Sequence, residues 1–400
     1  MNSNWQNLKT LTSENLWLEF LETEHKEAEA VTHLQSNQTA RHYAYINHLC
    51  LKVFFRWLKE NWELESADVF PNAKELASIW EVVNGTAINI GQTRLVLIPH
   101  DTVDTEEFSV PQEWVDIPNF AANYYLAAQI DLAQNWMRIW GYTTHKTLKE
   151  KGSYDPIYRT YTIKGDELIA DIDIILVAKE ICGAETANIP TLPALSEETA
   201  ASILAQISQP SPYSPRLDLP FAQWGALLGN DRWRQQLYIK RTATAPRKML
   251  VNLNHWLTNN FTESIKLGWR SVTEFLAPEP ELATVRNYPQ SHSVQQAKLL
   301  NLQLQLKQQA VVLLVALTPE ADGRVGVSIQ AHPYGNEKQL PTFLTLALLS
   351  DSFQQLHTVI SRERDSYIML PYFHCKKGTN FYIKIAIADV SLMEEFVIGQ

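Results

Sequence analysis

The chain has 400 residues, a formal net charge of −10, 45% hydrophobic residues and 20% charged residues. This composition excludes an intrinsically disordered chain, a collagen-like fibre and a small disulfide-stapled protein. At about 150 residues per domain, the length predicts two or three domains.

The compartment is predicted from the N-terminus, the apolar runs and the cysteines. Residues 1–17 lack the basic start and apolar core of a secretory signal, and the apolar run 310–317 is far shorter than the ~18 residues of a membrane-spanning helix. Cys50, Cys182 and Cys375 are widely spaced, which fits a reducing compartment and no structural zinc. We therefore expect a cytosolic protein with no membrane segment.

Helices are predicted at the start of an N-terminal α+β domain that spans residues 1–182. Apolar residues between 46 and 58 recur at the i, i+3, i+4, i+7 spacing of an amphipathic helix. A second helix is predicted around residues 16–21, so that helices together occupy residues 13–64.

A β-rich module is predicted over residues 80–180 of the same domain. Apolar and polar residues alternate there, and turn pairs such as Asn84-Gly85 separate the runs. Residues 143–159 are polar and charged, and we expect a loop.

The middle of the chain predicts a linker and then a helical segment. Residues 183–215 contain five prolines and many serines and threonines, with one short helix expected at residues 197–207. The sequence leaves open whether this linker is a free hinge or is docked on a domain surface. Residues 216–285 predict helices by the spacing of their apolar residues, but residues 232–248 are irregular and basic.

The C-terminal residues 290–400 predict an immunoglobulin-like β-sandwich. Short apolar or alternating runs separated by turn residues are typical of this fold. The runs are residues 309–317, 324–331, 342–349, 354–360, 367–370, 381–387 and 393–398. The whole chain is therefore predicted to be of the α+β class.

No sequence motif indicates a cofactor or a metal. The glycine spacings that cradle phosphates, G-x-x-x-x-G-K-[ST] and G-x-G-x-x-G, are absent, as are H-E-x-x-H and G-x-S-x-G. We expect no cofactor, no metal ligands and no catalytic residues, and we predict that the protein is not an enzyme.

Two weak histidine clusters keep an enzyme of unrecognised type open. His100 with Asp101 and Asp104 could bind a cation or hold a general base, although an exposed acidic turn would look the same. The second cluster could bind an acidic group or be a solvated loop; it comprises His145, Lys146, Lys149, Lys151, Asp155 and Arg159.

The strongest candidate for a binding surface is a basic segment that also contains tryptophan. Residues 216–270 hold nine basic and three acidic residues, a local charge of +6, so the rest of the chain carries −16. Arginine mixed with tryptophan binds acidic proteins or nucleic acid, although such a segment can also pack internally. The predicted partner-binding strip is Arg232, Trp233, Arg234, Lys240, Arg241, Arg247, Lys248 and Trp224.

Several runs of aromatic, proline and turn residues resemble a cyanobacterial family of unknown function, DUF1822. The runs include Val110-Pro-Gln-Glu-Trp-Val-Asp-Ile-Pro118, Trp140-Gly-Tyr-Thr-Thr-His145 and Glu395-Phe-Val-Ile398. The resemblance covers most of the chain from about residue 10. It implies no catalytic residues and adds an expectation of a regulatory protein partner.

Together these observations predict a non-enzymatic, cytosolic, regulatory protein that binds an acidic protein partner through the basic strip. A nucleic-acid-associated regulator is the first alternative, made unfavourable by the overall negative charge. An enzyme with a site near His100 or His145 is the second. The sequence leaves the oligomeric state open.

Overall fold

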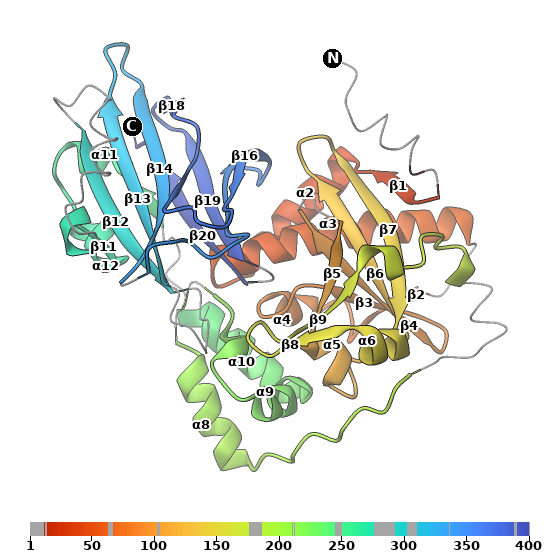
Figure 1. The fold of residues 1–400 in the computed structure, drawn as a ribbon. Coiled ribbons are helices and arrows are strands. Elements are labelled where there is room, and N and C mark those ends of the chain that lie inside the picture. The colour runs from red at the N-terminus through yellow and green to blue at the C-terminus, as the bar shows by residue number, and fades with distance from the viewer. Residues whose placement is uncertain are drawn as a thin grey trace. The chain divides into compact units, whose positions relative to one another are not determined.

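The computed structural model describes residues 12, 14–62, 67–101, 105–175, 186–209, 211, 213–244, 250–275, 293–301, 310–335, 337–387 and 390–399. The chain divides into two compact units, Met1–Pro246 (unit 1) and Arg247–Gln400 (unit 2), whose elements are labelled in Figure 1. Both units combine helices and strands, so the α+β class is confirmed. The division falls after the helices of residues 216–244 and not in the proline-rich segment 183–215.

Unit 1 is built around a six-stranded sheet of order β1-β7-β6-β4-β3-β2, in which only the β4–β6 pair is parallel. Its strands are β1 (Leu16–Glu19), β2 (Ala67–Phe70), β3 (Thr86–Ile90), β4 (Thr93–His100), β6 (Tyr124–Asp131) and β7 (Trp136–Thr144). A three-stranded sheet of order β5-β9-β8 accompanies it, formed by β5 (Glu107–Pro111), β8 (Ser153–Asp155) and β9 (Thr160–Lys164).

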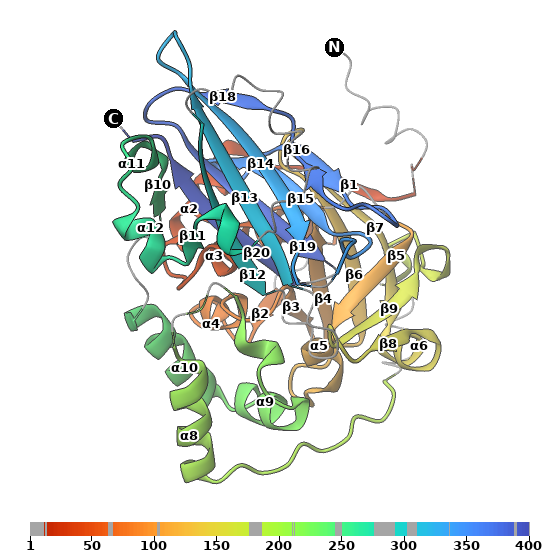
Figure 2. The ribbon, with the colours of Figure 1, turned by 60° about the vertical axis from the view of Figure 1, so that its left-hand side comes forward.

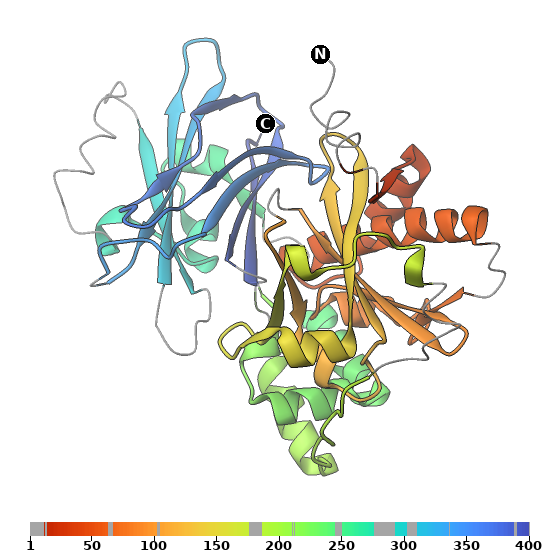
Figure 3. The ribbon, with the colours of Figure 1, turned by 45° about the vertical axis from the view of Figure 1, so that its right-hand side comes forward.

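The described helices of unit 1 pack on these sheets or on one another. They are α2 (Glu22–Thr32), α3 (Gln38–Asn61), α4 (Leu76–Trp80), α5 (Gln112–Asp116), α6 (His145–Lys151), α8 (Glu197–Ile207), α9 (Phe221–Leu228) and α10 (Asp231–Thr244). Asn37 caps α3 by accepting the N–H of Ala40, and the apolar stripe predicted for residues 46–58 is buried against β1 and β4. Helices α8, α9 and α10 gather at one end of the unit, drawn in green in Figure 3.

Two sequence predictions for unit 1 are wrong. The predicted helix around residues 16–21 is the edge strand β1, which pairs with β7 and places Trp17 against Trp136, with ring centroids 4.8 Å apart. The predicted loop at residues 143–159 contains helix α6, capped by the Thr144 side chain, and strand β8. Residues 16–19 form a strand because their side chains pack across the pairing with β7, and residues 145–151 form a helix because the Thr144 side chain caps its first turn.

The proline-rich segment is held against the rest of unit 1 at several points. The backbone N–H of Ala187 donates to Nδ1 of His145 at 3.0 Å. Leu192 lies against Gly225 of α9, where an added Cβ would be 3.1 Å from its Cδ1. Near the other end, the Ser214 hydroxyl donates to the carbonyl of Val82 at 2.6 Å. Proline keeps this segment extended but does not separate it from the domain.

Unit 2 contains two larger sheets. One has the order β10-β20-β19-β15-β16 and the other β11-β12-β13-β14-β17, with β18 also paired to β14. The first comprises β10 (Leu250–Asn252), β15 (Thr345–Ser350), β16 (Gln355–Ile360), β19 (Asn380–Ile387) and β20 (Val390–Val397). The second comprises β11 (Trp269–Arg270), β12 (Val294–Asn301), β13 (Ala310–Pro319), β14 (Val325–Pro333), β17 (Ile368–Met369) and β18 (Phe373–Cys375).

The two sheets of unit 2 face each other across an apolar core, as Figure 2 shows. Trp269 contacts both Trp256 and Phe396 through its ring, and Lys298 of β12 pairs with Glu394 of β20 at 2.6 Å. Short helices α11 (Leu253–Leu257) and α12 (Thr262–Lys266) precede β11. Every one of the seven predicted runs contains a strand of the structure, whereas the sequence prediction omitted β10, β11, β12 and β18.

Candidate functional site

The predicted basic strip centres on α10, which is a regular helix and not the irregular segment expected from the sequence. Arg234 and Arg241 are seven residues apart, so they lie on one face of the helix, two turns from each other. This face points inward, and both side chains are about 1% exposed. Trp233 is also buried, at 8% exposure.

Arg234 holds α10 against α4. Its Nη2 lies 2.7 Å from Oε2 of Glu75 and 2.8 Å from Oδ1 of Asp231. The remaining guanidinium nitrogens donate to the Leu228 carbonyl at 3.1 Å and to the Ser78 hydroxyl at 3.2 Å. Its hydrogen-bond donors are therefore occupied within unit 1.

Arg241, about two turns further along α10, makes a second buried ion pair. Its Nε donates to Oε1 of Glu81 at 2.7 Å, and both side chains are at most 1% exposed. The other nitrogens donate to the carbonyls of Ile207 and Tyr213 at 3.2 and 3.0 Å. Glu81 also accepts the backbone N–H of Ser36 at 2.9 Å, so this ion pair joins four separate segments.

Trp224 belongs to a third buried cluster, centred on Glu113 of α5. Glu113 is fully buried, and its two carboxylate oxygens accept Nε and Nη2 of Arg216 at 2.9 and 2.8 Å. The indole N–H of Trp224 donates to the same carboxylate at 2.8 Å. Such a bidentate pair satisfies both the acid and the guanidinium away from water.

The prediction that these side chains form a surface strip is therefore wrong for the buried members, Trp224, Trp233, Arg234 and Arg241. The physical reason is that each buried arginine faces a carboxylate of its own unit. Arg232 and Lys240 are exposed, and Arg232 pairs with the exposed Glu197 of α8. Arg247 and Lys248 lie outside the described residues.

The two histidines named for an enzyme lie at opposite ends of β6. His100 ends β4 and is aligned with Gln129, near the end of β6, whereas His145 follows Thr144, which is aligned with Tyr124 at the start of β6. The pairing therefore does not bring them into one site. In the portion of the chain that the structure describes, no group of three or more His, Cys, Asp or Glu side chains is placed to hold a metal ion.

His145 has a structural role. Its Nε2 lies 3.0 Å from the Val115 carbonyl, and its Nδ1 accepts the Ala187 N–H, so the neutral ring bridges two segments. Burial lowers the pKa of His145. His42 is buried 3.3 Å from Asp101, and Asp104 lies outside the described residues.

Charged residues of the second predicted cluster also act within the fold. Lys149 lies 2.8 Å from Oδ1 of Asp116 and 2.7 Å from the hydroxyl of Tyr161, and that hydroxyl donates to Asp116 at 2.8 Å. Arg159 is buried with a positive φ of 54°, and its guanidinium donates to the carbonyls of Arg216 and Leu219.

A different feature is the outer edge of β16 in unit 2, which lies near β17 without pairing with it. β16 ends its sheet, and no described strand pairs with its other side. Ser361, the next residue, donates its N–H to the Leu344 carbonyl at 2.9 Å and accepts the Phe343 N–H at 3.0 Å. Because these groups alternate along an antiparallel strand, the N–H and C=O of Thr358 and Ile360 point away from β15.

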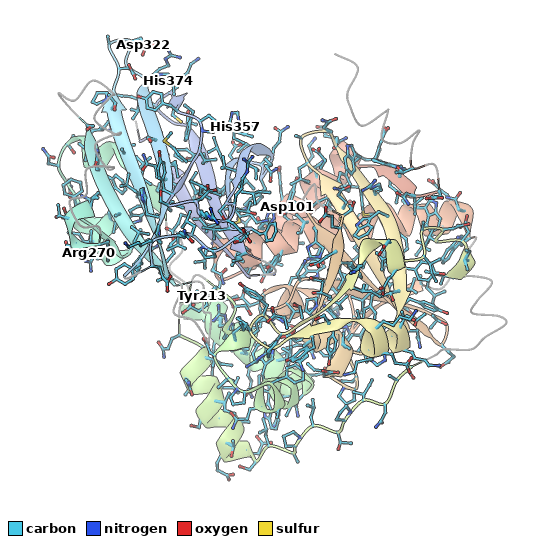
Figure 4. The ribbon with its side chains drawn as sticks, in the orientation of Figure 1. Asp101, Tyr213, Arg270, Asp322, His357 and His374 are labelled. Carbon is cyan, nitrogen blue, oxygen red and sulfur yellow. The ribbon has the colours of Figure 1, made fainter. Side chains whose placement is uncertain are left out.

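Large apolar side chains on and near this strand are exposed, together with the polar His357 and Thr358. Leu356 and Ile360 are 48% and 50% exposed, and Phe343, beside the end of β16, is 70% exposed. The strand reads QLHTVI and contains no Asp, Glu, Lys or Arg. His357, labelled in Figure 4, marks its position. A β-bulge between the registers of Leu348 and Leu349 limits the regular edge to the C-terminal half of β16.

Sequence reasoning predicted this strand but not its importance. The signal was present: residues 354–360 lack the charges and prolines with which natural edge strands avoid pairing with other chains. Whether a strand lies at an edge follows from sheet order, which the run of residues alone does not reveal.

Within the described residues, no helix has the length and apolar character needed to cross a membrane.

The family of the chain follows from comparison with known proteins. Curated proteins and solved structures gave no match. The family model described as "Protein of unknown function (DUF1822)" matches residues 18–397, nearly the whole chain. The protein therefore belongs to the DUF1822 family, as its aromatic and proline motifs predicted.

Proposed function

We propose that the protein binds a partner protein by strand addition, with an extended segment of the partner pairing with the outer edge of β16. The observation that supports this is the set of outward backbone N–H and C=O groups at Thr358 and Ile360, in a strand without charges. An extended peptide satisfies such groups in register, as in other proteins that recognise a peptide by strand addition. This edge replaces the basic strip as the proposed contact, because the strip's buried arginines are paired within unit 1.

The partner segment is expected to be extended and mainly apolar. Main-chain hydrogen bonds give affinity in this binding mode, and alternate side chains give specificity. Leu356 and Ile360, 48% and 50% exposed, present apolar surface on the edge strand itself. An uncharged strand with β-branched or aromatic residues on one face fits this surface best.

The cytosol is the compartment that we propose for this interaction. Cys50 and Cys375 are free and buried thiols, at 0% and 5% exposure. Burial raises the pKa of the Cys375 thiol to about 11 and raises that of Cys50 as well. Buried neutral thiols of this kind suit a reducing compartment and are chemically inert.

The test is selection from a displayed library of random ten-residue peptides, panned against the immobilised full chain. Two variants of β16 are panned in parallel. Thr358→Pro removes a backbone N–H that points away from β15, so it removes a bond to the ligand but none to the sheet. Thr358→Ala keeps that N–H and is the matched control. Circular dichroism and urea midpoints verify that both variants are folded.

The wild type and Thr358→Ala are expected to enrich the same apolar, β-prone peptides, and Thr358→Pro is expected to lose them. N-methylation of alternate amides in a selected peptide should abolish binding, while methylation of the intervening amides should not. The proposal is overturned if the wild type enriches nothing, or if a folded Thr358→Pro variant binds the same peptides equally well.

A further inference from the structure

Arg138 of β7 is a buried arginine that meets no carboxylate. It is 5% exposed, and within the described residues its side chain takes part in no ion pair and no hydrogen bond. Burial lowers the pKa of Arg138, because no partner offsets the loss of water. Arg216, Arg234 and Arg241 of the same unit each lie 2.7 or 2.8 Å from a carboxylate oxygen. A buried charge without such a partner is costly, so Arg138 requires an explanation that the fold does not supply.

A second buried donor lies beside Arg138. Trp136 is two residues earlier on β7, so both side chains project from one face of the sheet. Trp136 is also 5% exposed, and its indole N–H finds no acceptor in the part of the chain that the structure describes. The ring of Trp17 on β1 contacts both, since its centroid is 4.8 Å from that of Trp136 and 5.3 Å from Cζ of Arg138. Two donors that lack acceptors are therefore gathered around one aromatic ring.

The sheet is polar at the level of Arg138. Arg138 is aligned with Trp17 of β1 and with Gln129 of β6, and Gln129 is aligned with His100 of β4. Residues aligned in this way project from the same face, so Gln129 and His100 lie on the side of the guanidinium. Gln129 is 5% exposed, and its amide can both donate and accept hydrogen bonds. This face is therefore able to surround a polar group.

Two carboxylates project from the same face but do not neutralise Arg138. Glu19 and Asp131 are both aligned with Trp136, two residues from Arg138 along β7. Glu19 is exposed, and Asp131 accepts the backbone N–H of Gln134 at 2.9 Å. Neither forms an ion pair with Arg138. Their negative charges disfavour a ligand that carries more than one negative charge of its own.

We infer that Arg138 and Trp136 bind the carboxylate of a small organic acid, whose apolar part lies against the ring of Trp17. The carboxylate accepts Nε of Arg138 and Nε1 of Trp136, the two donors that the fold leaves without acceptors. One guanidinium neutralises one carboxylate, whereas a phosphate dianion would leave excess negative charge among tryptophans. Trp17 is partly exposed on the end strand of the sheet, so the ligand is expected to enter beside it. This site is separate from the β16 edge and does not rest on the proposed function.

The first test measures the melting temperature of the full chain by tryptophan fluorescence with sodium phenylacetate, sodium acetate or sodium phosphate. Sodium chloride at equal ionic strength is the reference. Phenylacetate at ten times its Kd should raise the melting temperature by about 3–5 °C, acetate should act only at higher concentration, and phosphate should match chloride. Arg138→Met should lose the response and melt no lower than the wild type without ligand, because a buried charge is removed. Arg232→Met, at an exposed arginine of the same unit, is the matched control and should keep the response.

The second test observes the guanidinium directly. The Nε–H signal of Arg138 in the isotope-labelled chain is assigned by its loss in Arg138→Met, and phenylacetate should move it. Trp136→Phe keeps a ring but removes the indole donor, and it should weaken phenylacetate binding about tenfold, as expected for one hydrogen bond to a charged group.

Four outcomes would overturn the site. The first is a wild type that no carboxylate stabilises beyond chloride, and the second is an Arg138→Met variant that responds as the wild type does. The third is a markedly lower melting temperature of ligand-free Arg138→Met, which would assign the guanidinium to the fold. The fourth is an Arg138 signal that Glu19→Gln or Asp131→Asn moves as far as phenylacetate does, since a carboxylate of the chain would then be its partner. A response to phosphate equal to that to phenylacetate would overturn the assignment to a monocarboxylate.

Discussion

In unit 1 the guanidinium groups of Arg216, Arg234 and Arg241 are buried and each meets a carboxylate, whereas the β16 edge of unit 2 leaves uncharged backbone groups facing outward. Three of the nine basic residues in the most positively charged segment, residues 216–270, therefore meet carboxylates inside the fold. The segment with no charge carries the open hydrogen-bonding groups. A local excess of charge shows where ion pairs are needed, but it does not show whether the partner lies inside or outside the chain.

The buried pairs of unit 1 join segments that are far apart in the sequence. Glu113 reaches residues 216 and 224, and Glu81 reaches residues 36 and 241. A buried ion pair contributes little net stability compared with a well-packed apolar pair, but breaking it leaves an uncompensated charge. We therefore expect substitutions in these buried pairs to lower the unfolding free energy strongly, and substitutions at exposed charges or at the outer edge of β16 to change it little.

Removing Arg216 is expected to have the largest effect. Arg216→Ala removes the guanidinium that neutralises the buried carboxylate of Glu113 and leaves the Trp224 indole as its remaining side-chain donor within the described residues. The unfolding free energy of unit 1 should therefore fall by about 3–5 kcal/mol. Urea unfolding followed by tryptophan fluorescence measures this. The double variant Glu113→Ala/Arg216→Ala should be less destabilised than the sum of the single variants. A loss of unfolding free energy below about 1 kcal/mol for Arg216→Ala would show that breaking the Glu113–Arg216 pair does not leave a costly buried charge.

The second prediction uses the contrast within unit 2 between Phe343 and Phe353, whose φ values are +64° and +60° but whose side chains are 70% and 6% exposed. Phe353→Gly removes a buried ring stacked on Tyr382, which costs about 3–5 kcal/mol, and relieves about 1 kcal/mol of backbone strain. The net expected loss of unfolding free energy is therefore about 2–4 kcal/mol. Phe343→Gly, which removes an exposed ring and relieves the same kind of strain, should leave the unfolding free energy unchanged or raise it slightly. Urea titration of both variants measures the difference. Equal effects at the two positions would remove the distinction between a packed ring and an exposed one.

Much of the fold could be predicted because apolar periodicity reports directly on burial. The stripe of α3, the helix at residues 197–207 and the alternation of residues 381–387 were all visible in the sequence, and the structure contains each element. Helix α10 was not visible, because its inward face contains Arg234 and Arg241, which count as polar in a periodicity. Buried arginines break the apolar pattern only because carboxylates elsewhere in the chain satisfy them.

The domain boundary and the site depend on contacts between distant residues. Five prolines predicted a linker at residues 183–215 and left open whether it is docked; contacts with His145, Gly225 and Val82 hold that segment within unit 1. The β16 strand was predicted from its own residues, yet its place at a sheet edge follows from the order of all five strands. The positive φ of Phe343 likewise depends on Ser361 and not on the residues of the turn alone.

The third prediction concerns pH and applies to unit 2. His332 stacks on Tyr367 with centroids 5.4 Å apart, and burial lowers its pKa to about 4, from about 6.5 in an unfolded chain. Between these two values the unfolded chain binds the extra proton, so the unfolding free energy falls as pH decreases from about 6.5 to about 4. The loss attributable to His332 should be roughly 1–3 kcal/mol. His332→Gln should flatten this part of the pH profile, and an unchanged slope would contradict the assignment to His332.

Substitution of Arg232 has the smallest expected effect on stability. It allows an exposed arginine to be compared with the buried Arg234 on the same helix. Arg232 lies two residues before Arg234 on α10 and therefore on the other side of the helix. Its side chain is 57% exposed, and its partner Glu197 is 68% exposed. Exposed pairs of this kind contribute little, so Arg232→Ala should change the unfolding free energy by less than about 0.5 kcal/mol. Arg234→Ala, which removes a buried guanidinium bonded to Glu75, Ser78 and the Leu228 carbonyl, should cost several times more. Urea titrations of the two variants in one buffer, repeated at high salt, measure both effects. Equal losses would mean that burial does not separate these arginines, and that the inward and outward faces of α10 contribute alike to the stability of unit 1.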